Sequence, residues 1–240
     1  MVIEDLGING FRFAQDSATF KLGTDAVLLS DFARVRGRVC DLGCGSGAVT
    51  VLLAARHPRI ALCGVEIQES AAALARENAA LNALQDRMEV RVGDLCRIEE
   101  IFSPGSFDAV VSNPPYFPVG SGVPMELEEQ RIAKMEIACT VRDVCRAAGY
   151  LLQEGGLFSL VYRPERLAEL FAALAEAGFA PKRMRMVQNK PSAEPSLVLI
   201  EARKGAKPGL RSLPVLCIRE EDGRETLELQ KIYHKIHTDV

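Results

Sequence analysis

Apolar segments of strand length alternate with helical segments through most of the chain, and this order constrains the fold most strongly. The patterns predict strands at 39–42, 60–65, 88–92, 107–112, 157–162, 179–188 and 196–202. They predict helices at 26–33, 48–55, 69–81, 128–148 and 164–177, the first of them capped by Thr24 or Asp25. Strands that are apolar throughout suit a parallel sheet with helices on both faces, so the chain is expected to be α/β and doubly wound. Ligands of such sheets bind at the carboxyl ends of the strands.

The length of 240 residues suits one large α/β domain with a short addition at each end. We expect this domain at 37–205. Residues 1–36 would form an N-terminal extension with a short hairpin and a helix. Residues 206–240 would form a C-terminal tail with room for a strand and a short helix.

The seven cysteines include no C-x-x-C pair, and no histidine lies at metal-ligand spacing from any of them. The N-terminus lacks a signal-peptide pattern, and no apolar run is long enough to cross a bilayer. Free thiols without an export signal indicate a cytoplasmic protein. We therefore expect no bound metal and no association with membranes.

A glycine-rich segment, DLGCGSG at 41–47, follows the first strand of the domain. Glycines at Gly43, Gly45 and Gly47 allow a tight turn and let a ligand approach the backbone. Gly43, Gly45 and Ala48 also satisfy the dinucleotide motif G-x-G-x-x-A. An NAD-dependent oxidoreductase is therefore an alternative, as is a module that binds the cofactor without catalysis.

Three acids, Asp41, Glu66 and Asp94, stand at the ends of three successive strands. Asp41 would repel a pyrophosphate but could pair with the ammonium of a methionine moiety. Glu66 could accept both hydroxyls of a ribose, and Asp94 could accept a hydrogen bond from an adenine amino group. This set favours S-adenosylmethionine over a dinucleotide, although the acids could also simply cap the following helices.

The fourth strand ends in Ser112 and the segment Asn113-Pro114-Pro115-Tyr116. A conjugated amino group is a poor nucleophile, and two hydrogen-bond acceptors would draw its nitrogen toward sp³ geometry. The Asn113 side chain and the Pro114 backbone carbonyl could be these acceptors, and Pro115 would fix the direction of the Pro114 carbonyl. Tyr116 offers a face on which a planar target can stack. The segment therefore predicts methylation of an exocyclic amino nitrogen.

DLGCGSG, Glu66 and the GDL that contains Asp94 together resemble the class I, Rossmann-like methyltransferases. The resemblance implies a seven-stranded, mostly parallel sheet whose last two strands form an antiparallel pair. It also implies a cofactor site for S-adenosylmethionine formed by Asp41, Gly43, Gly45, Gly47, Glu66, Ile67, Asp94, Leu95 and Asn113.

NPPY resembles the motif of amino-nitrogen methyltransferases, which act on adenine N6, cytosine N4 or a protein glutamine. The segments 11–33, 131–136 and 196–205 further resemble bacterial tRNA adenine-N6 methyltransferases, whose target lies beside the anticodon of a valine tRNA. Glutamine methyltransferases carry a helical bundle before the cofactor loop, for which the 40 residues before Asp41 are too few. A tRNA is the favoured substrate, and ribosomal RNA and a protein glutamine remain alternatives.

The net charge of −3 does not indicate a nucleic-acid binder, but the charge is unevenly distributed. The window from Lys182 to Arg211 contains eight Lys or Arg and two Glu, a net charge of +6. It could supply phosphate contacts or be an ordinary solvated face. We predict that the substrate is bound by Tyr116, Phe117, Lys182, Arg183, Arg185 and Lys190.

Overall fold

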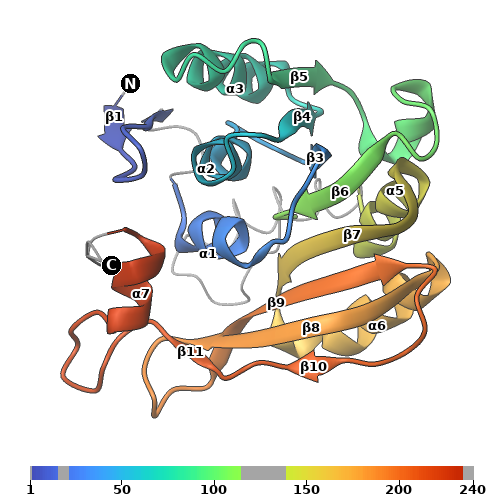
Figure 1. Ribbon diagram of the computed structural model, residues 1–240. Helices are drawn as coiled ribbons and strands as arrows, with labels where there is room; N and C mark the ends of the chain where they lie inside the picture. The colour runs from blue at the N-terminus through green and yellow to red at the C-terminus, as the bar shows by residue number, and fades with distance from the viewer. Residues whose placement is uncertain (1, 16–21, 115–138, 235–240) are drawn as a thin grey trace, which may run out of the picture.

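The described residues form a central sheet of nine strands with helices on both faces (Figure 1). The computed structural model describes residues 2–15, 22–114 and 139–234. The sheet order is β10-β8-β9-β7-β6-β3-β4-β5, and β11 pairs with β8 beside β10. The strands are β3 Arg38–Leu42, β4 Ala61–Glu66, β5 Met88–Val92, β6 Phe107–Ser112, β7 Leu152–Tyr162, β8 Phe179–Gln188, β9 Pro195–Lys204, β10 Arg211–Ser212 and β11 Leu216–Cys217.

Strands β3 to β7 pair in parallel, and β9 is antiparallel to both β7 and β8. The predicted fold class and the antiparallel pair are therefore confirmed. The strand count differs from seven, because the two-residue strands β10 and β11 extend the sheet beyond β8. Strands this short leave no periodic pattern in a sequence.

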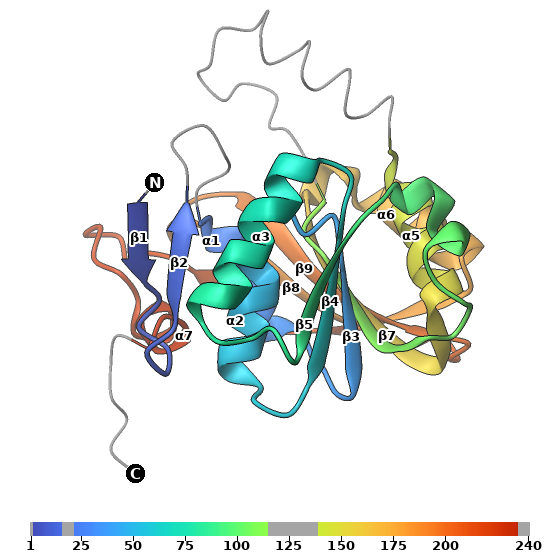
Figure 2. The same cartoon turned by 90° about the horizontal axis from the view of Figure 1, so that it is seen from above.

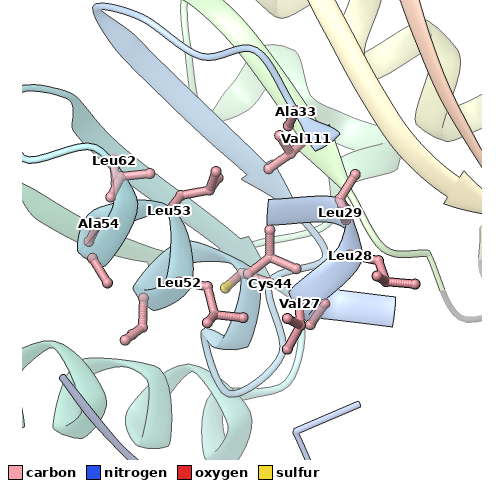
Figure 3. Packing of buried hydrophobic residues seen from close by; sticks show 14 of the residues in the cluster. Val27, Leu28, Leu29, Ala33, Cys44, Leu52, Leu53, Ala54, Leu62 and Val111 are labelled. Carbon is pink, nitrogen blue, oxygen red and sulfur yellow. The ribbon is translucent and has the colours of Figure 1, made fainter. Parts of the chain in front are cut away.

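The two faces of the sheet bury separate apolar clusters. Helices α1 Thr24–Phe32, α2 Ala48–Arg56 and α3 Glu69–Leu81 cover one face, and α5 Val141–Leu151 and α6 Leu167–Glu176 cover the other (Figure 2). Figure 3 shows the first cluster, in which Leu29 of α1 and Leu53 of α2 pack near Cys44. The described residues also form two 3-10 helices: η1 Leu95–Glu100 follows β5, and η2 Pro164–Arg166 leads directly into α6.

Two of the predicted helix starts are wrong. Helix α1 begins at Thr24 after Gly23, which has no side chain, so neither Thr24 nor Asp25 is its cap. Helix α5 begins at Val141, because Thr140 and Asp143 form a capping box there, and the predicted helix at 128–148 does not continue through 139–140. Its first part, at 128–138, lies outside the described residues.

The N-terminal hairpin and the last described helix pack on the helices of the first face. Strands β1 Val2–Asp5 and β2 Arg12–Gln15 form the expected hairpin, and β2 packs against α3. Helix α7 Leu227–Ile232 packs against α1. The guanidinium of Arg56 on α2 donates to the Ser30 hydroxyl at 3.1 Å and to the Ile232 carbonyl at 2.7 Å, which joins α1, α2 and α7. No helix of the described segments is long and apolar enough to cross a membrane.

Candidate active site

The glycine loop between β3 and α2 leaves open space on one side. Gly43, Gly45 and Gly47 all have positive φ, at 73°, 54° and 85°. The N–H groups of Gly43 and Cys44 donate to the Val65 carbonyl at 2.9 and 3.0 Å, which fixes the loop against β4. A Cβ added at Gly43 or Gly45 would meet none of the described atoms within 4 Å. The loop can therefore take a ligand against its backbone, as the sequence predicts for S-adenosylmethionine.

Glu66 lies at the carboxyl end of β4 and holds the same loop. Its carboxylate accepts from the Gly45 N–H and from the Gln68 N–H, both at 2.9 Å, and the residue is 8% exposed. Each bond uses one acceptor position of a carboxylate that has about four. Positions remain that could accept ribose hydroxyls.

An apolar surface adjoins Glu66. Ile67 is 57% exposed, and Val92, which pairs with Glu66 across the sheet, is 39% exposed. Asp94 follows Val92 and accepts from the Cys96 N–H at 2.8 Å, so it caps η1. Asp94 and Leu95 are both half-buried. The capping of η1 leaves the Asp94 carboxylate able to accept a further bond.

Asp41 differs from the other two acids because it is 1% exposed. Its carboxylate accepts from the Thr50 hydroxyl of α2 at 2.6 Å. Burial raises the pKa of Asp41 to about 7, and the hydrogen bond from Thr50 opposes this rise. The pairing of Asp41 with an ammonium group stays a prediction.

The end of β6 is tied directly to the end of β3. The Ser112 hydroxyl donates to the Leu42 carbonyl at 2.8 Å and is fully buried. Asn113 follows, half-buried, and then Pro114, which is buried. This bond places Asn113 at the same edge of the sheet as the glycine loop. Pro115, Tyr116 and Phe117 lie outside the described residues.

The predicted substrate-binding cations all have partners within the chain. Arg183 pairs with Glu201 at 2.8 Å and Arg185 with Glu228 at 2.6 Å, and the two arginine side chains are 15% and 16% exposed. Lys182 donates to the Lys207 carbonyl, and Lys190 donates to the Glu221 carbonyl at 3.4 Å. The structure therefore does not gather the four into one uncompensated cationic surface.

Cys96, Cys139 and Asp143 bring possible metal-ligand atoms within 4.8 Å of one another, although Cys96 is distant in sequence from the other two. The Asp143 carboxylate already accepts from the N–H and hydroxyl of Thr140, and it pairs with Arg146 at 3.0 Å. The capping of α5 accounts for the position of Asp143. The expectation that the protein binds no metal stays a prediction.

Thr50, Ser112 and Asn78 are polar residues near the site to which the sequence patterns assigned no role. All three are fully buried and hydrogen-bonded. Asn78 offered one usable signal, because it stands three residues after Ala75 on the apolar face of a predicted helix. A polar residue at such a position needs a buried partner.

The sequence of this chain is similar to those of known methyltransferases. Residues 17–175 match the methyltransferase small domain. A protein from Bacteroides thetaiotaomicron, named tRNA1(Val) (adenine(37)-N6)-methyltransferase, is 34% identical over 199 residues, which cover 79% of this chain and 81% of that protein. A protein of the same name from Dickeya chrysanthemi is 30% identical over 240 residues, which cover 95% and 93%.

Solved structures agree with this assignment. A predicted O-methyltransferase from Agrobacterium tumefaciens has a TM-score of 0.72 and 26% identity, over 88% of this chain and 95% of its own. TrmN from Thermus thermophilus has a TM-score of 0.55 and 25% identity, over 75% and 48%. The chain belongs to the methyltransferase small domain family of S-adenosylmethionine-dependent enzymes.

Proposed function

We propose that this protein transfers a methyl group from S-adenosylmethionine to the N6 amino nitrogen of an adenine in the anticodon loop of a tRNA, with a valine tRNA as the favoured substrate. The observation that carries the proposal is the position of Asn113-Pro114, which the Ser112–Leu42 hydrogen bond holds beside the glycine loop. The printed names of the relatives support the choice of tRNA and of adenine. A tRNA substrate would place the protein in the cytoplasm.

Gly43, Gly45 and Glu66 would hold the cofactor, with Ile67, Asp94 and Leu95 around its adenine and Asp41 and Gly47 behind the loop. When bound, S-adenosylmethionine supplies an electrophilic methyl group. The open side of the glycine loop and the remaining acceptor positions of Glu66 fit such a ligand. The absence of a metal in the reaction is part of the same proposal.

The chain's own contribution to the chemistry is positioning. The Asn113 side-chain carbonyl and the Pro114 backbone carbonyl would each accept a hydrogen bond from one N–H of the target amino group. These two bonds would stabilise the positive charge that develops on nitrogen. Pro115 would fix the direction of the Pro114 carbonyl, and Tyr116 would stack on the base. An anticodon loop presents unpaired bases that can be swung out at low cost.

The contacts within the chain divide the predicted RNA-binding residues into two kinds. Lys182 and Lys190 donate to neutral carbonyls in the contacts above, so their ammonium groups are less compensated than the two arginines, although the Asp222 carboxylate interacts with Lys190. Arg183 and Arg185 pair with carboxylates and would contribute less. Tyr116 and Phe117 complete the proposed substrate site.

Methylation of purified tRNA with labelled S-adenosylmethionine, followed by nucleoside analysis, tests the proposal. N6-methyladenosine is expected in whole tRNA, with less product from the isolated anticodon stem-loop. The Asn113→Ala variant serves as the control for chemistry at the proposed site. Product found solely as N4-methylcytosine, solely in ribosomal RNA, or solely on a protein glutamine would overturn the substrate.

A further inference from the structure

One face of α3 contacts both the glycine loop and the N-terminal hairpin. Ala75, Asn78 and Asn82 are three and four residues apart, so they share this face. At one end, a Cβ on Gly47 would come within 3.2 Å of the Ala75 Cβ, so the loop packs directly on the helix. At the other end, Asn82 accepts from the Arg12 N–H at 2.8 Å and donates to the Arg12 carbonyl at 2.7 Å.

Asn78 stands between these two contacts and is fully buried. Its side-chain oxygen accepts from the Ala14 N–H at 2.7 Å. Its side-chain nitrogen donates to the Ala14 carbonyl at 2.9 Å and to the Ser46 carbonyl at 3.0 Å. Both N–H bonds of the amide are thereby used. One side chain thus joins β2 of the hairpin to the glycine loop.

The position of Ser46 matters because it lies within the glycine loop, between Gly45 on the open side and Gly47 at the start of α2. Gly45, directly before it, donates its N–H to Glu66, which we assign to the ribose. Gly47, directly after it, begins the turn into α2 with a positive φ. A buried carbonyl that loses its donor is costly, so the loop cannot shift freely while Asn78 is held by Ala14. The amide therefore makes the loop conformation depend on the docking of the hairpin.

We propose that Asn78 is a positioning residue for cofactor binding, through which the docked hairpin raises the affinity for S-adenosylmethionine. The inference rests on the proposed function for the identity of the cofactor and is independent of the methyl acceptor. Asn82 holds the same hairpin and donates to the Asn78 backbone carbonyl at 2.8 Å, but it makes no printed hydrogen bond to the loop, so it provides a control for hairpin docking one helical turn away.

The test compares Asn78→Asp with Asn82→Asp. Each substitution is nearly isosteric and replaces N–H donors with an acceptor, but only Asn78→Asp places that acceptor against Ser46. We expect Asn78→Asp to raise both the Kd and the KM for S-adenosylmethionine about tenfold, the equivalent of one lost hydrogen bond. Its kcat at saturating cofactor should stay within about twofold of wild type, because uniform binding is lost rather than transition-state binding. Asn82→Asp should raise the Kd by clearly less than Asn78→Asp does, because it weakens the docking of the hairpin and the bond to the Asn78 carbonyl but leaves the contact between Asn78 and Ser46 in place.

Thermal denaturation first establishes that both variants are folded at the assay temperature. Equal changes of Kd in the two variants, or an unchanged Kd in a folded Asn78→Asp, would overturn the proposal. So would a fall in kcat without a change in KM. Failure to find N6-methyladenosine in tRNA would overturn the proposed function and leave this result standing, because the Kd is measured without RNA.

A measurement on the wild-type protein keeps the proposal testable if Asn78→Asp does not fold. Coupling between two sites is reciprocal, so bound cofactor must stabilise the docked hairpin by the same factor. We expect S-adenosylhomocysteine to slow hydrogen exchange of the Ala14 amide, which donates to Asn78. Protection of the glycine loop without protection of Ala14 would contradict the proposed coupling.

Discussion

The two halves of the sheet hold their charged residues in different ways. In the cofactor half, Asp41, Glu66 and Asp94 accept hydrogen bonds from neutral groups of the chain. In the half formed by β8 and β9, carboxylates meet arginines, as in the pair of Arg183 with Glu201. A charge that is compensated inside the fold is not available to a ligand. The three acids therefore keep a charge that a ligand could use, whereas the net charge of the window overstates the cations left free in β8.

The largest expected effect is on stability, and it tests whether the Arg183–Glu201 pair is compensated inside the fold. Glu201 is 2% exposed, so among the described residues Arg183→Met would leave this buried carboxylate with Arg34, at 4.0 Å, as its remaining ion-pair partner. Removing one partner of a buried ion pair costs about 3–5 kcal/mol, and Arg34 should offset part of it. Urea denaturation should show a loss of about 3 kcal/mol in the free energy of unfolding. Lys190→Met, measured alongside, should change it by less than about 0.5 kcal/mol. Equal values for the two variants would mean that Arg183 is an ordinary surface charge.

The next effect concerns catalysis at the edge of the cofactor half. Asn113→Ala removes one proposed acceptor of the target amino group. We expect methylation to slow by roughly 10²-fold or more, as for other lost transition-state partners, with the affinity for cofactor nearly unchanged. Single-turnover assays and calorimetry give the two quantities. Full activity would reduce Asn113 to a turn residue.

Glu66→Ala tests the role of the acids more directly. It removes an acceptor proposed for the ribose and one that holds the Gly45 N–H. The affinity for S-adenosylmethionine should fall by about 1–3 kcal/mol, the usual cost of a lost bond to a charged group. Glu69→Ala is the control, because the Glu69 side chain is 72% exposed and pairs with Arg76. Unchanged affinity in Glu66→Ala would remove Glu66 from the site.

The raised pKa of Asp41 predicts a smaller, pH-dependent effect. With a pKa of about 7 its carboxyl is mostly protonated at acidic pH and ionised above neutrality. The ionised form attracts a cationic cofactor, so affinity should rise by about 1 kcal/mol between about pH 5.5 and 7.5. Asp41→Asn should make the profile flatter over this range.

The same pKa acts on the unliganded protein in the opposite direction. The folded carboxyl keeps its proton where the unfolded one has lost it, so its contribution to stability should fall as pH rises from about 4 to about 7. A free energy of unfolding with the same pH dependence in wild type and in Asp41→Asn would contradict the assignment.

The smallest effect concerns RNA binding. A Lys182→Gln and Lys190→Gln double variant should weaken binding of unrelated RNAs to a similar extent and lower the salt slope by about 1–2, because phosphate contacts release counterions. The same slope in the double variant and wild type would leave both lysines as solvated surface.

How much the sequence could predict depended on whether a residue's partner is local. Strand periodicity and the glycine motif predicted Glu66 and Asp94 as site residues, since Glu66 stands directly after one apolar strand and Asp94 two residues after the next. Arg183 and Glu201 are 18 residues apart and meet only because β8 and β9 pair antiparallel. The positive charge of the window from Lys182 to Arg211 was counted correctly, but its neutralisation by carboxylates in the folded protein could not be predicted.

The buried amide of Asn78 illustrates the same limit. Its helix was predicted at the bounds that the structure shows, 69–81. Its partners, Ala14 and Ser46, are 64 and 32 residues away, and both contribute backbone groups, which have no sequence signature. The predicted cap of α1 was wrong for a local reason instead, because Gly23 occupies the N-cap position and makes no side-chain hydrogen bond.

The place of β9 in the sheet also determines when the protein can become complete during synthesis. β9 is among the last strands to be made, yet it lies between β7 and β8 and is antiparallel to both. While residues 195–204 are still in the ribosome, β7 has a free edge and β8 has no neighbour to join it to the sheet. The half that carries the glycine loop and Glu66 ends at Ser112 and can pair its strands much earlier. The nascent chain thus passes through a state with the cofactor half assembled and an exposed strand edge, which makes slow translation before Pro195 a period of risk for aggregation.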